Sequence, residues 1–234
     1  MRNRLFVLVA PFLFSCIGDG DVDAANLIAC GAYDSSTHIC DVRDGNLYRI
    51  AEMPDGKMWM AENLKYVPLS GLSKCYRDKP ENCEVYGRLY SWDNRANLCP
   101  DGWKIPNMKS DWEPLEDEVG AGVLDERLKA TNGWDSYDNG KNGNGLDSYK
   151  FTVLPGGAYS VRYYANEDIF NDSAICNESE NFNDWGNNGA ESLGRIAVFM
   201  SSSDQSKWII SNEPALRFCV ASNALVSVRC VREN

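Results

Sequence analysis

Cysteine is the residue type with the clearest chemical potential in this sequence, because nine cysteines accompany a single histidine, His38. A Ser-His-Asp triad or a Cys-His pair would have to use His38 alone, and a zinc site with two histidine ligands is excluded. We predict that His38 is a surface loop residue. Exported chains normally pair their cysteines, so an odd number indicates that one cysteine has a separate role.

The N-terminus indicates what that role is. Arg2 and Arg4 precede an apolar run of ten residues, Leu5–Phe14, which is too short to span a bilayer and is typical of a signal peptide. It leads into Leu13-Phe14-Ser15-Cys16, which resembles the lipobox of bacterial lipoproteins. The resemblance implies a signal peptide over 1–15 and a lipid attached to the Cys16 thiol. The alternative is an ordinary secretory signal that is cleaved further along the chain.

Export would set the charge and the redox state of the mature chain. Loss of residues 1–15 removes two positive charges and changes the formal charge from −11 to −13. Such an acidic balance argues against nucleic-acid binding. An oxidising compartment makes disulfides the default for the other eight cysteines. We therefore expect an outer membrane lipoprotein, at the cell surface or in the periplasm, that touches the membrane only through its N-terminal lipid.

The chain divides into a short tether and one domain. We expect residues 16–40 to form a lipid-anchored tether with a local disulfide, Cys30 to Cys40, and 41–234 to form a single domain. Turn residues predict a hairpin of strands at 47–50 and 57–60. A second local disulfide, Cys75 to Cys83, would close a polar loop.

Two short helices and several further strands are predicted. A helix over 110–119 would begin with a capping box formed by Ser110 and Glu113. Apolar spacing would bury Trp112, Leu115 and Val119 of this helix, and Leu124 and Leu128 of a second helix over 123–130. Strands are expected at 151–154, 195–200, 207–210, 216–220 and 225–231.

Several blocks, taken in order, resemble the Fibrobacter succinogenes major paralogous domain family over about 41–234. The blocks are Asp44-Gly-Asn-Leu-Tyr48, Trp59-Met-Ala-Glu-Asn-Leu64, Tyr86-Gly-Arg-Leu-Tyr-Ser-Trp92, Cys99-Pro-Asp-Gly-Trp103 with Pro106, Trp112-Glu113, Phe151 with Leu154-Pro-Gly-Gly157, and Ser227-Val-Arg-Cys-Val-Arg232. The family is found on exported, often lipid-anchored proteins of fibre-degrading bacteria. The resemblance therefore implies a fold and a location more than a function.

The resemblance implies an α+β, C-type-lectin-like fold with two short helices, small antiparallel sheets and long loops, stapled by disulfides. In such folds a long-range disulfide ties the first-helix region to the last strand, which here implies Cys99 with Cys230. Cys176 with Cys219 would then be the inner pair. Eight cysteines allow 105 connectivities, so the fold and not the spacing selects these two pairs.

No cofactor is expected, and calcium is the one metal that we consider. Many lectin-like folds use calcium, and hard cations prefer several oxygen ligands within one loop. The segment 135–147 is rich in such oxygens, which places the candidate site near Asp135, Asp138 and Asp147. Its aspartates and glycines do not follow the EF-hand register, and turn formation is the alternative explanation of this composition.

Loop aromatics form the second candidate site. Sugar-binding platforms combine exposed aromatic faces with neighbouring amide or carboxylate groups. The candidate ligand-binding residues are Trp134, Tyr137, Tyr163, Asn183, Asp184 and Trp185. The alternative is that these aromatics pack the core, and this is the interpretation that we adopt for Trp59, Trp92, Trp103 and Trp112.

The sequence supports three hypotheses of different classes. The first is an exported, lipid-anchored, non-catalytic binding module of the cell envelope that recognises a glycan or another surface ligand. The second is a structural or protein-interaction module of the envelope without a sugar site. The third is an oxidase-like enzyme related to sulfatase-modifying factors, which we disfavour because Cys219 and Cys230 are better explained as structural disulfides. Acidic pairs are plentiful, but no spacing selects a catalytic pair.

Overall fold

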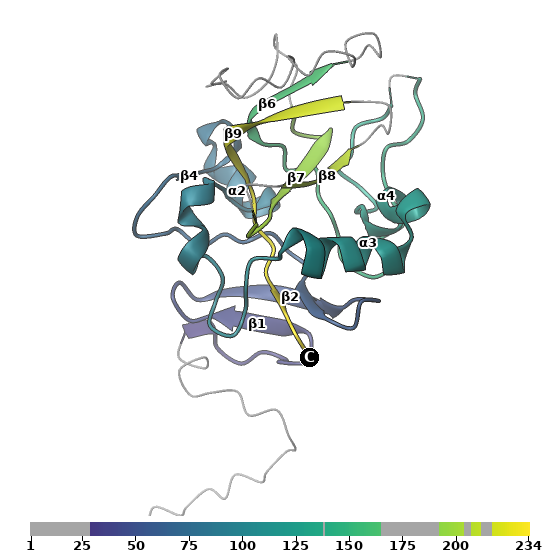
Figure 1. Cartoon of the computed structure of the whole chain (residues 1–234). Coiled ribbons are helices and arrows are strands. Elements are labelled where there is room, and N and C mark those ends of the chain that lie inside the picture. The colour runs from purple at the N-terminus through teal and green to yellow at the C-terminus, as the bar shows by residue number, and fades with distance from the viewer. Residues whose placement is uncertain (1–28, 138, 165–191, 204–206, 212–216) are drawn as a thin grey trace, which may run out of the picture.

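Two β-sheets form the centre of the computed structural model, which describes residues 29–137, 139–164, 192–203, 207–211 and 217–234 (Figure 1). The four-stranded sheet has the order β1-β2-β3-β10. Its strands are β1 (His38–Asp41), β2 (Asn46–Glu52), β3 (Met58–Met60) and β10 (Val231–Arg232). All of its pairings are antiparallel, and β10 brings the end of the chain beside the N-terminal hairpin.

The second sheet has the order β4-β5-β9-β7-β8, and β6 also pairs with β9. Its strands are β4 (Ser73–Lys74), β5 (Leu89–Tyr90), β6 (Tyr159–Tyr164), β7 (Ile196–Met200), β8 (Lys207–Ser211) and β9 (Arg217–Ser227). One contact between β7 and β9 is parallel, at Phe199 and Ser227, and the other pairings are antiparallel.

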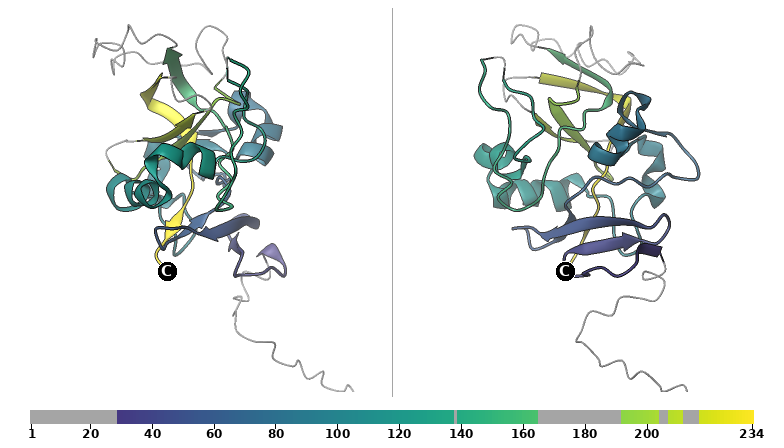
Figure 2. Two further views of the ribbon diagram at one scale, coloured as in Figure 1. Left: turned by 90° about the vertical axis from the view of Figure 1, so that its right-hand side faces the viewer. Right: turned by 180° about the vertical axis from the view of Figure 1, so that it is seen from behind.

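Short helices flank the strands. The α-helices are α2 (Pro80–Tyr86), α3 (Glu113–Val119) and α4 (Leu124–Leu128); the single turns are η1 (Tyr76–Asp78), η2 (Trp92–Asn97), η3 (Met108–Trp112) and η4 (Ala121–Val123). The views of Figure 2 keep α2 and the α3–α4 pair on opposite sides of the strands. No helix in the described part of the chain has the length and apolarity needed to cross a bilayer.

The predicted helices are present, but their starts differ from expectation. Ser110 is not the cap: the helical segment begins after Asn107, whose side-chain oxygen accepts from the Lys109 and Ser110 amides. The first turn is widened into a π-type turn, so that Glu113 begins the α-helix proper and does not fold back onto a cap. The predicted inward residues Trp112, Leu115, Val119, Leu124 and Leu128 are all buried.

The strand predictions are confirmed where the pairing is local. The hairpin at 47–50 and 57–60 is β2 and β3, and 195–200 and 207–210 correspond to β7 and β8. The last two expected strands are instead one long strand, β9, followed by the short β10. Segment 151–154 forms a single bridge, between Val153 and Lys129. Other main-chain groups of the segment bond to side chains and not to a second strand: the Thr152 amide donates to Asp147, and the Phe151 and Thr152 carbonyls accept from Arg229.

Two segments expected to be loops contain regular structure. The segment between Cys75 and Cys83 carries η1 and the start of α2, where Pro80 suits the first helical turn. His38 was expected in a surface loop, but it begins β1 and pairs with Arg49. Its Nδ1 lies 2.9 Å from the Thr37 hydroxyl, which is a local contact.

The core is built around stacked tryptophans. Trp112 lies 4.5 Å from Trp208 with nearly parallel rings and 4.7 Å from Trp59, measured between ring centroids. Phe151 and Phe199 close the cluster at its edges. Trp59 and Trp112 therefore belong to the core, as predicted. Trp92 and Trp103 are half-buried and pack against the second core cluster, which contains Tyr48 and Tyr90.

Three disulfides staple this fold, and they are three of the four expected pairs. They join Cys30 to Cys40, Cys75 to Cys83, and Cys99 to Cys230. The last links the segment before η3 to the segment before β10, across 131 residues of sequence. The Cys176–Cys219 pair lies outside the residues whose side chains are described, and so does Cys16.

Candidate functional site

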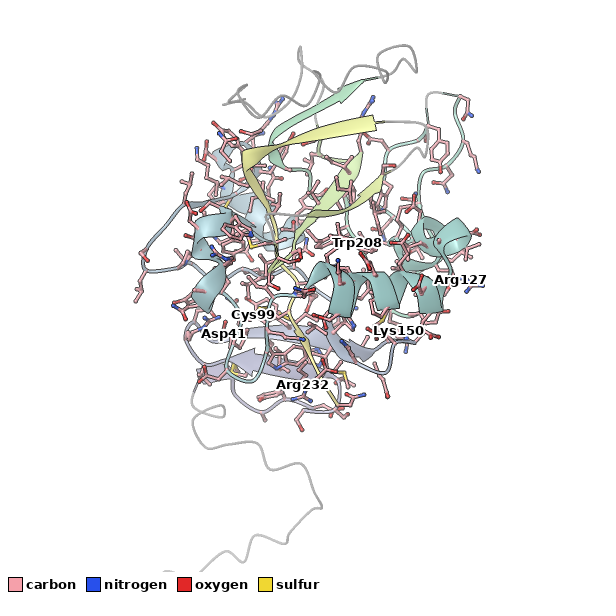
Figure 3. All side chains as sticks on the ribbon, viewed as in Figure 1. Asp41, Cys99, Arg127, Lys150, Trp208 and Arg232 are labelled. Atoms are coloured by element: carbon pink, nitrogen blue, oxygen red, sulfur yellow. A yellow bond between two sulfur atoms is a disulfide. The ribbon has the colours of Figure 1, made fainter. Side chains whose placement is uncertain are left out.

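A cleft with a volume of about 530 Å³ lies beside α4, and we call it the Tyr137 cleft. One wall is η4 with the start of α4, and the other is the loop from Tyr137 to Leu146. In Figure 3, Arg127 marks the outer end of α4, on the side of the molecule away from Asp41 and Cys99. The cleft is lined by Ala121, Gly122, Val123, Leu124, Asp125, Glu126, Lys129, Tyr137, Lys141, Asn142, Asn144 and Leu146.

The loop wall is fixed to the end of α4 by main-chain hydrogen bonds. The amides of Gly145 and Leu146 donate to the carbonyls of Ala130 and Glu126, at 2.9 and 2.7 Å. These carbonyls belong to the last helical turn and the residues after it, which have no partner within the helix. Gly145 is required by space: a Cβ atom there would lie 2.4 Å from the carbonyl oxygen of Lys129.

Trp134, a predicted sugar-binding residue, is part of the interior. Its side chain is 5% exposed, and its indole N–H donates to the Val153 carbonyl at 2.9 Å. Its amide donates to the side chain of Asn144, which ties the start of the loop to its end. A ring this deeply covered has no free face, so the prediction that Trp134 forms an exposed platform is wrong. The Trp134 ring instead packs beside Lys129, which lines the cleft.

Lys129 places a buried amine at the base of the cleft. The residue is 2% exposed, and its ammonium donates to the Ser211 carbonyl at 3.3 Å and lies 4.9 Å from the Trp134 ring centroid. Burial lowers the pKa of Lys129, although the Asp125 charge opposes the shift. Burial likewise raises the pKa of Asp125. Both groups lie where water is partly excluded, so their hydrogen bonds to a ligand would be strong.

Tyr137 supplies the aromatic surface of the cleft. It is half-buried, and the ammonium groups of Lys141 and Lys129 lie 5.4 and 5.9 Å from its ring centroid. Its amide donates to the Lys141 carbonyl at 2.7 Å, which makes a tight turn that directs both side chains to one wall. Asn142 and Asn144 also line the cleft. An aromatic face with amides, amines and carboxylates matches the groups that bind polyhydroxylated ligands.

The other predicted ligand-binding residues do not join this cleft in the described structure. Asn183, Asp184 and Trp185 lie outside the described residues. Tyr163 lies in β6, where only the backbone is described, opposite Phe218 of β9. Of the two candidates whose side chains are described, Trp134 and Tyr137, Tyr137 lines the cleft.

The candidate calcium ligands have separate partners. The Asp147 carboxylate accepts from the Thr152 amide and hydroxyl, at 2.6 and 2.7 Å, which is a local turn. The Asp135 carboxylate lies 3.9 Å from the Arg195 guanidinium, and Asp138 lies outside the described residues. Among the residues that the structure covers, no three His, Cys, Asp or Glu side chains come together as a metal site would require.

A second group of polar side chains lies in the core and joins the Trp59–Leu64 segment to the Ser227–Arg232 segment. Arg229 is fully buried; its Nε donates to Asn63 Oδ1 at 2.8 Å, and its terminal nitrogens donate to the carbonyls of Phe151 and Thr152. Burial lowers the pKa of Arg229 to about 9. Asn63 also donates to the Tyr86 carbonyl. Because these donors are occupied by the protein itself, we assign the constellation a structural role.

Sequence reasoning missed Lys129 and Arg229. Lys129 directly follows α4 and belongs to no motif, so only its position beside the loop that lines the cleft identifies it. Arg229 stands in the Ser227–Arg232 block, which resembles the family pattern, but its partner Asn63 is 166 residues away. No local pattern connects the two residues.

Comparison with known proteins identifies the family of the chain. The model of the Fibrobacter succinogenes major domain matches residues 55–232, which is most of the chain, so the chain belongs to that family. The matched range contains the Tyr137 cleft, the Asn63–Arg229 constellation and the Cys99–Cys230 disulfide. No curated protein matches the chain, and no solved structure does.

Proposed function

We propose that this member of the Fibrobacter succinogenes major domain family is an exported, lipid-anchored, non-catalytic binding module of the cell envelope. Its ligand is a glycan, bound in the Tyr137 cleft. Family membership and three disulfides support a role outside the cytoplasm. The lipobox-like segment before Cys16 supports the anchor.

The proposal includes a C-type-lectin-like arrangement of the chain. The Cys99–Cys230 bond supports it, because it ties the region before the first long helical segment to the last strand pair. The mixture of short helices, small antiparallel sheets and long connections is also compatible with it. In this arrangement the long loops carry ligand specificity on a stapled scaffold.

The observation that carries the glycan proposal is the chemistry of the cleft. One tyrosine ring lies among two asparagine amides, two lysine ammonium groups and the carboxylates of Asp125 and Glu126. Sugar rings present apolar C–H faces and many hydroxyls, so they need an aromatic surface together with donors and acceptors. The volume of about 530 Å³ lies within the usual range for small-ligand sites.

Retention of the mature protein on insoluble polysaccharides tests this function. We expect retention on at least one member of a panel of cellulose, xylan and pectin. Tyr137→Ala should weaken binding about tenfold through loss of the ring, whereas Tyr137→Phe keeps the ring and should bind nearly normally. Tyr33→Ala, a half-buried tyrosine between Cys30 and Cys40, is the matched control. Equal retention of all three variants would place the glycan elsewhere.

Failure on every polysaccharide would favour the second hypothesis, a protein-interaction module of the envelope. In that case crosslinking on intact cells should retain protein partners and no glycan.

An oxidase-like enzyme would require reactive thiols, so titration of the native mature chain should find no free cysteine if the non-catalytic proposal holds. Intact mass tests the anchor, because an acylated Cys16 adds the lipid mass.

Calcium enters the proposal through the sequence alone, because the oxygen-rich segment 135–147 contains Asp135, Asp138 and Asp147. Retention on the polysaccharide panel is measured with added calcium and after chelation. Loss of retention on chelation, and its recovery when calcium is restored, would support the ion. Retention that is unchanged by chelation would remove calcium from the proposal.

A further inference from the structure

A protruding aliphatic loop connects β3 to β4, and we call residues 66–72 the aliphatic loop. Leu69 at its tip is 100% exposed, and Val67 and Leu72 are 59% and 49% exposed. Single exposed aliphatic residues are ordinary on protein surfaces, but three within six residues form a patch that indicates an interaction site. In Figure 1 this loop projects outward just before β4.

Both ends of the aliphatic loop are fixed to the core, so its exposure is built into the fold. The Tyr66 carbonyl accepts from the Tyr90 hydroxyl at 2.7 Å. The Leu72 carbonyl accepts from the Ser91 amide at 3.0 Å and from the Asn94 side chain at 2.9 Å. Gly71 has a positive φ of 83°, and the Asn94 side chain fills the place where a Cβ would be. The tip is thus presented on a rigid base.

The base of the aliphatic loop contacts the β1–β2 turn, close to where the described chain begins. The Arg43 guanidinium lies 3.8 Å from the Tyr66 ring centroid, which connects the base of the loop to the β1–β2 turn. Val42 in that turn is also exposed. The carbonyl of Ala29, the first described residue, packs against Gly45 of the same turn. The aliphatic patch and the point of entry of the tether therefore share one side of the molecule.

We propose that the aliphatic loop inserts into the surface of the lipid bilayer to which Cys16 is attached, so that the loop is a second membrane contact. The inference rests on the proposed lipid anchor, which would keep the aliphatic loop at a high local concentration at the membrane. It revises our expectation that the lipid is the only membrane contact. Twelve residues separate Cys16 from Ala29, and the thirteen steps from one Cα atom to the next span at most about 45 Å when fully extended. A protruding tip of this kind suits a soft apolar layer better than it suits a rigid protein groove.

This contact would orient the cleft. Figure 3 shows Asp41, beside the β1–β2 turn, and Arg127, on α4, on opposite sides of the molecule. With the aliphatic loop on the bilayer, α4 and the Tyr137 cleft face away from the membrane. A ligand could then approach without competition from the lipid surface.

Depth-dependent fluorescence quenching tests the inference. The mature chain carrying Leu69→Trp is compared with the chain carrying Leu146→Trp, a residue that is 61% exposed on the far side. The vesicles are phosphatidylcholine brominated in the acyl chains, which excludes attraction between opposite charges as the cause of binding. We expect the fluorescence of Leu69→Trp to be quenched, with little dependence of the quenching on salt. The fluorescence of Leu146→Trp should not be quenched.

A lipid-free arm separates the loop from the anchor. The mature chain carrying Cys16→Ser is measured at high vesicle concentration, where Leu69→Asp should lower the bound fraction about tenfold because it removes the burial of one leucine. Leu146→Asp should leave that fraction unchanged. A native chain whose mass shows no acyl group would overturn the anchor only, and the lipid-free arm would still decide the loop. The inference is overturned if Leu69→Trp is quenched no more than Leu146→Trp and if Leu69→Asp and Leu146→Asp give equal bound fractions in the lipid-free arm.

Discussion

At the scale of single residues, Asp111 is a buried carboxylate whose replacement should destabilise the fold. Its carboxylate is fully buried and lies 2.5 Å from the Lys57 ammonium and 3.1 Å from that of Lys104. It also accepts from the Asn107 amide at 2.7 Å, which fixes the start of η3. Burial alone would raise the pKa of Asp111, but the hydrogen bonds from Lys57 and Asn107 outweigh burial and hold the pKa below its usual value.

We predict that Asp111→Asn lowers the free energy of unfolding by about 2–4 kcal/mol at pH 7, because it leaves buried donors without their anion. Since the folded-state pKa lies below the unfolded value, the contribution of the carboxylate is complete above about pH 4 and is lost as the pH falls through the folded-state pKa. The gap between the wild type and Asp111→Asn should therefore narrow on acidification.

Urea unfolding followed between pH 7 and pH 2 measures both effects. Lys104→Gln is the control, because Lys104 is half-exposed and its loss should cost less than about 1 kcal/mol. An Asp111→Asn chain as stable as the wild type at pH 7 would show that the cluster contributes no net stability.

At the scale of elements, the cleft exists because an irregular loop is bonded to the end of a very short helix. α4 spans five residues, too few to be stable alone, and its last carbonyls are satisfied by the loop rather than by a further turn. Gly145 makes that contact sterically feasible. The loop therefore contributes both the cap of the helix and one wall of the cleft.

We predict that Gly145→Ala pushes the loop away from α4 and weakens glycan retention. A Cβ would lie 2.4 Å from the Lys129 carbonyl oxygen, and relief of that overlap should cost about 1–3 kcal/mol. Hydrogen exchange should speed up at the Leu146 amide, which donates to Glu126. Gly122→Ala is the matched control for stability and exchange, because a Cβ at Gly122 meets nothing within 4 Å. Unchanged exchange at Leu146 in Gly145→Ala would contradict this account.

At the scale of the whole molecule, the Cys99–Cys230 disulfide and β10 bring the two ends of the domain together. Val231 pairs with Trp59 of β3, while Cys230 is bonded to the segment that leads into η3. The Asn63–Arg229 contact lies alongside, so three consecutive residues, 229–231, are each linked to a distant part of the chain. The C-terminus is thus an integral part of the core.

We predict that the disulfides contribute unequally. In the chain-entropy description, a bond that closes 131 residues stabilises the fold by about 5 kcal/mol, and one that closes ten residues by about 2.7 kcal/mol. The Cys99→Ala/Cys230→Ala chain should therefore lose about 2 kcal/mol more than the Cys30→Ala/Cys40→Ala chain. Denaturant unfolding of both variants compares them directly. Equal losses would indicate that strain or residual unfolded structure, and not loop length, sets their contributions.

The sequence by itself determined the features that depend on near neighbours. The β2–β3 hairpin followed from turn residues, the buried faces of α3 and α4 from residue spacing, and the Cys30–Cys40 and Cys75–Cys83 pairs from short separation. The Cys99–Cys230 pair came from the family resemblance instead. The hairpin, the helix faces and the two local disulfides each depend on an interaction between residues that are close in the chain, so a local sequence pattern is enough to predict them.

The tertiary structure alone decided which of the loop residues form a site. Trp134 and Tyr137 are three residues apart in one polar loop, yet Trp134 is buried against Val153 and Tyr137 lines the cleft. That difference depends on partners that the loop sequence does not contain, the bridge between Lys129 and Val153 and the strand end at Ser211. Burial is a property of all surrounding elements together, and for this reason the sequence identified the loop but did not distinguish the buried Trp134 from the cleft-lining Tyr137.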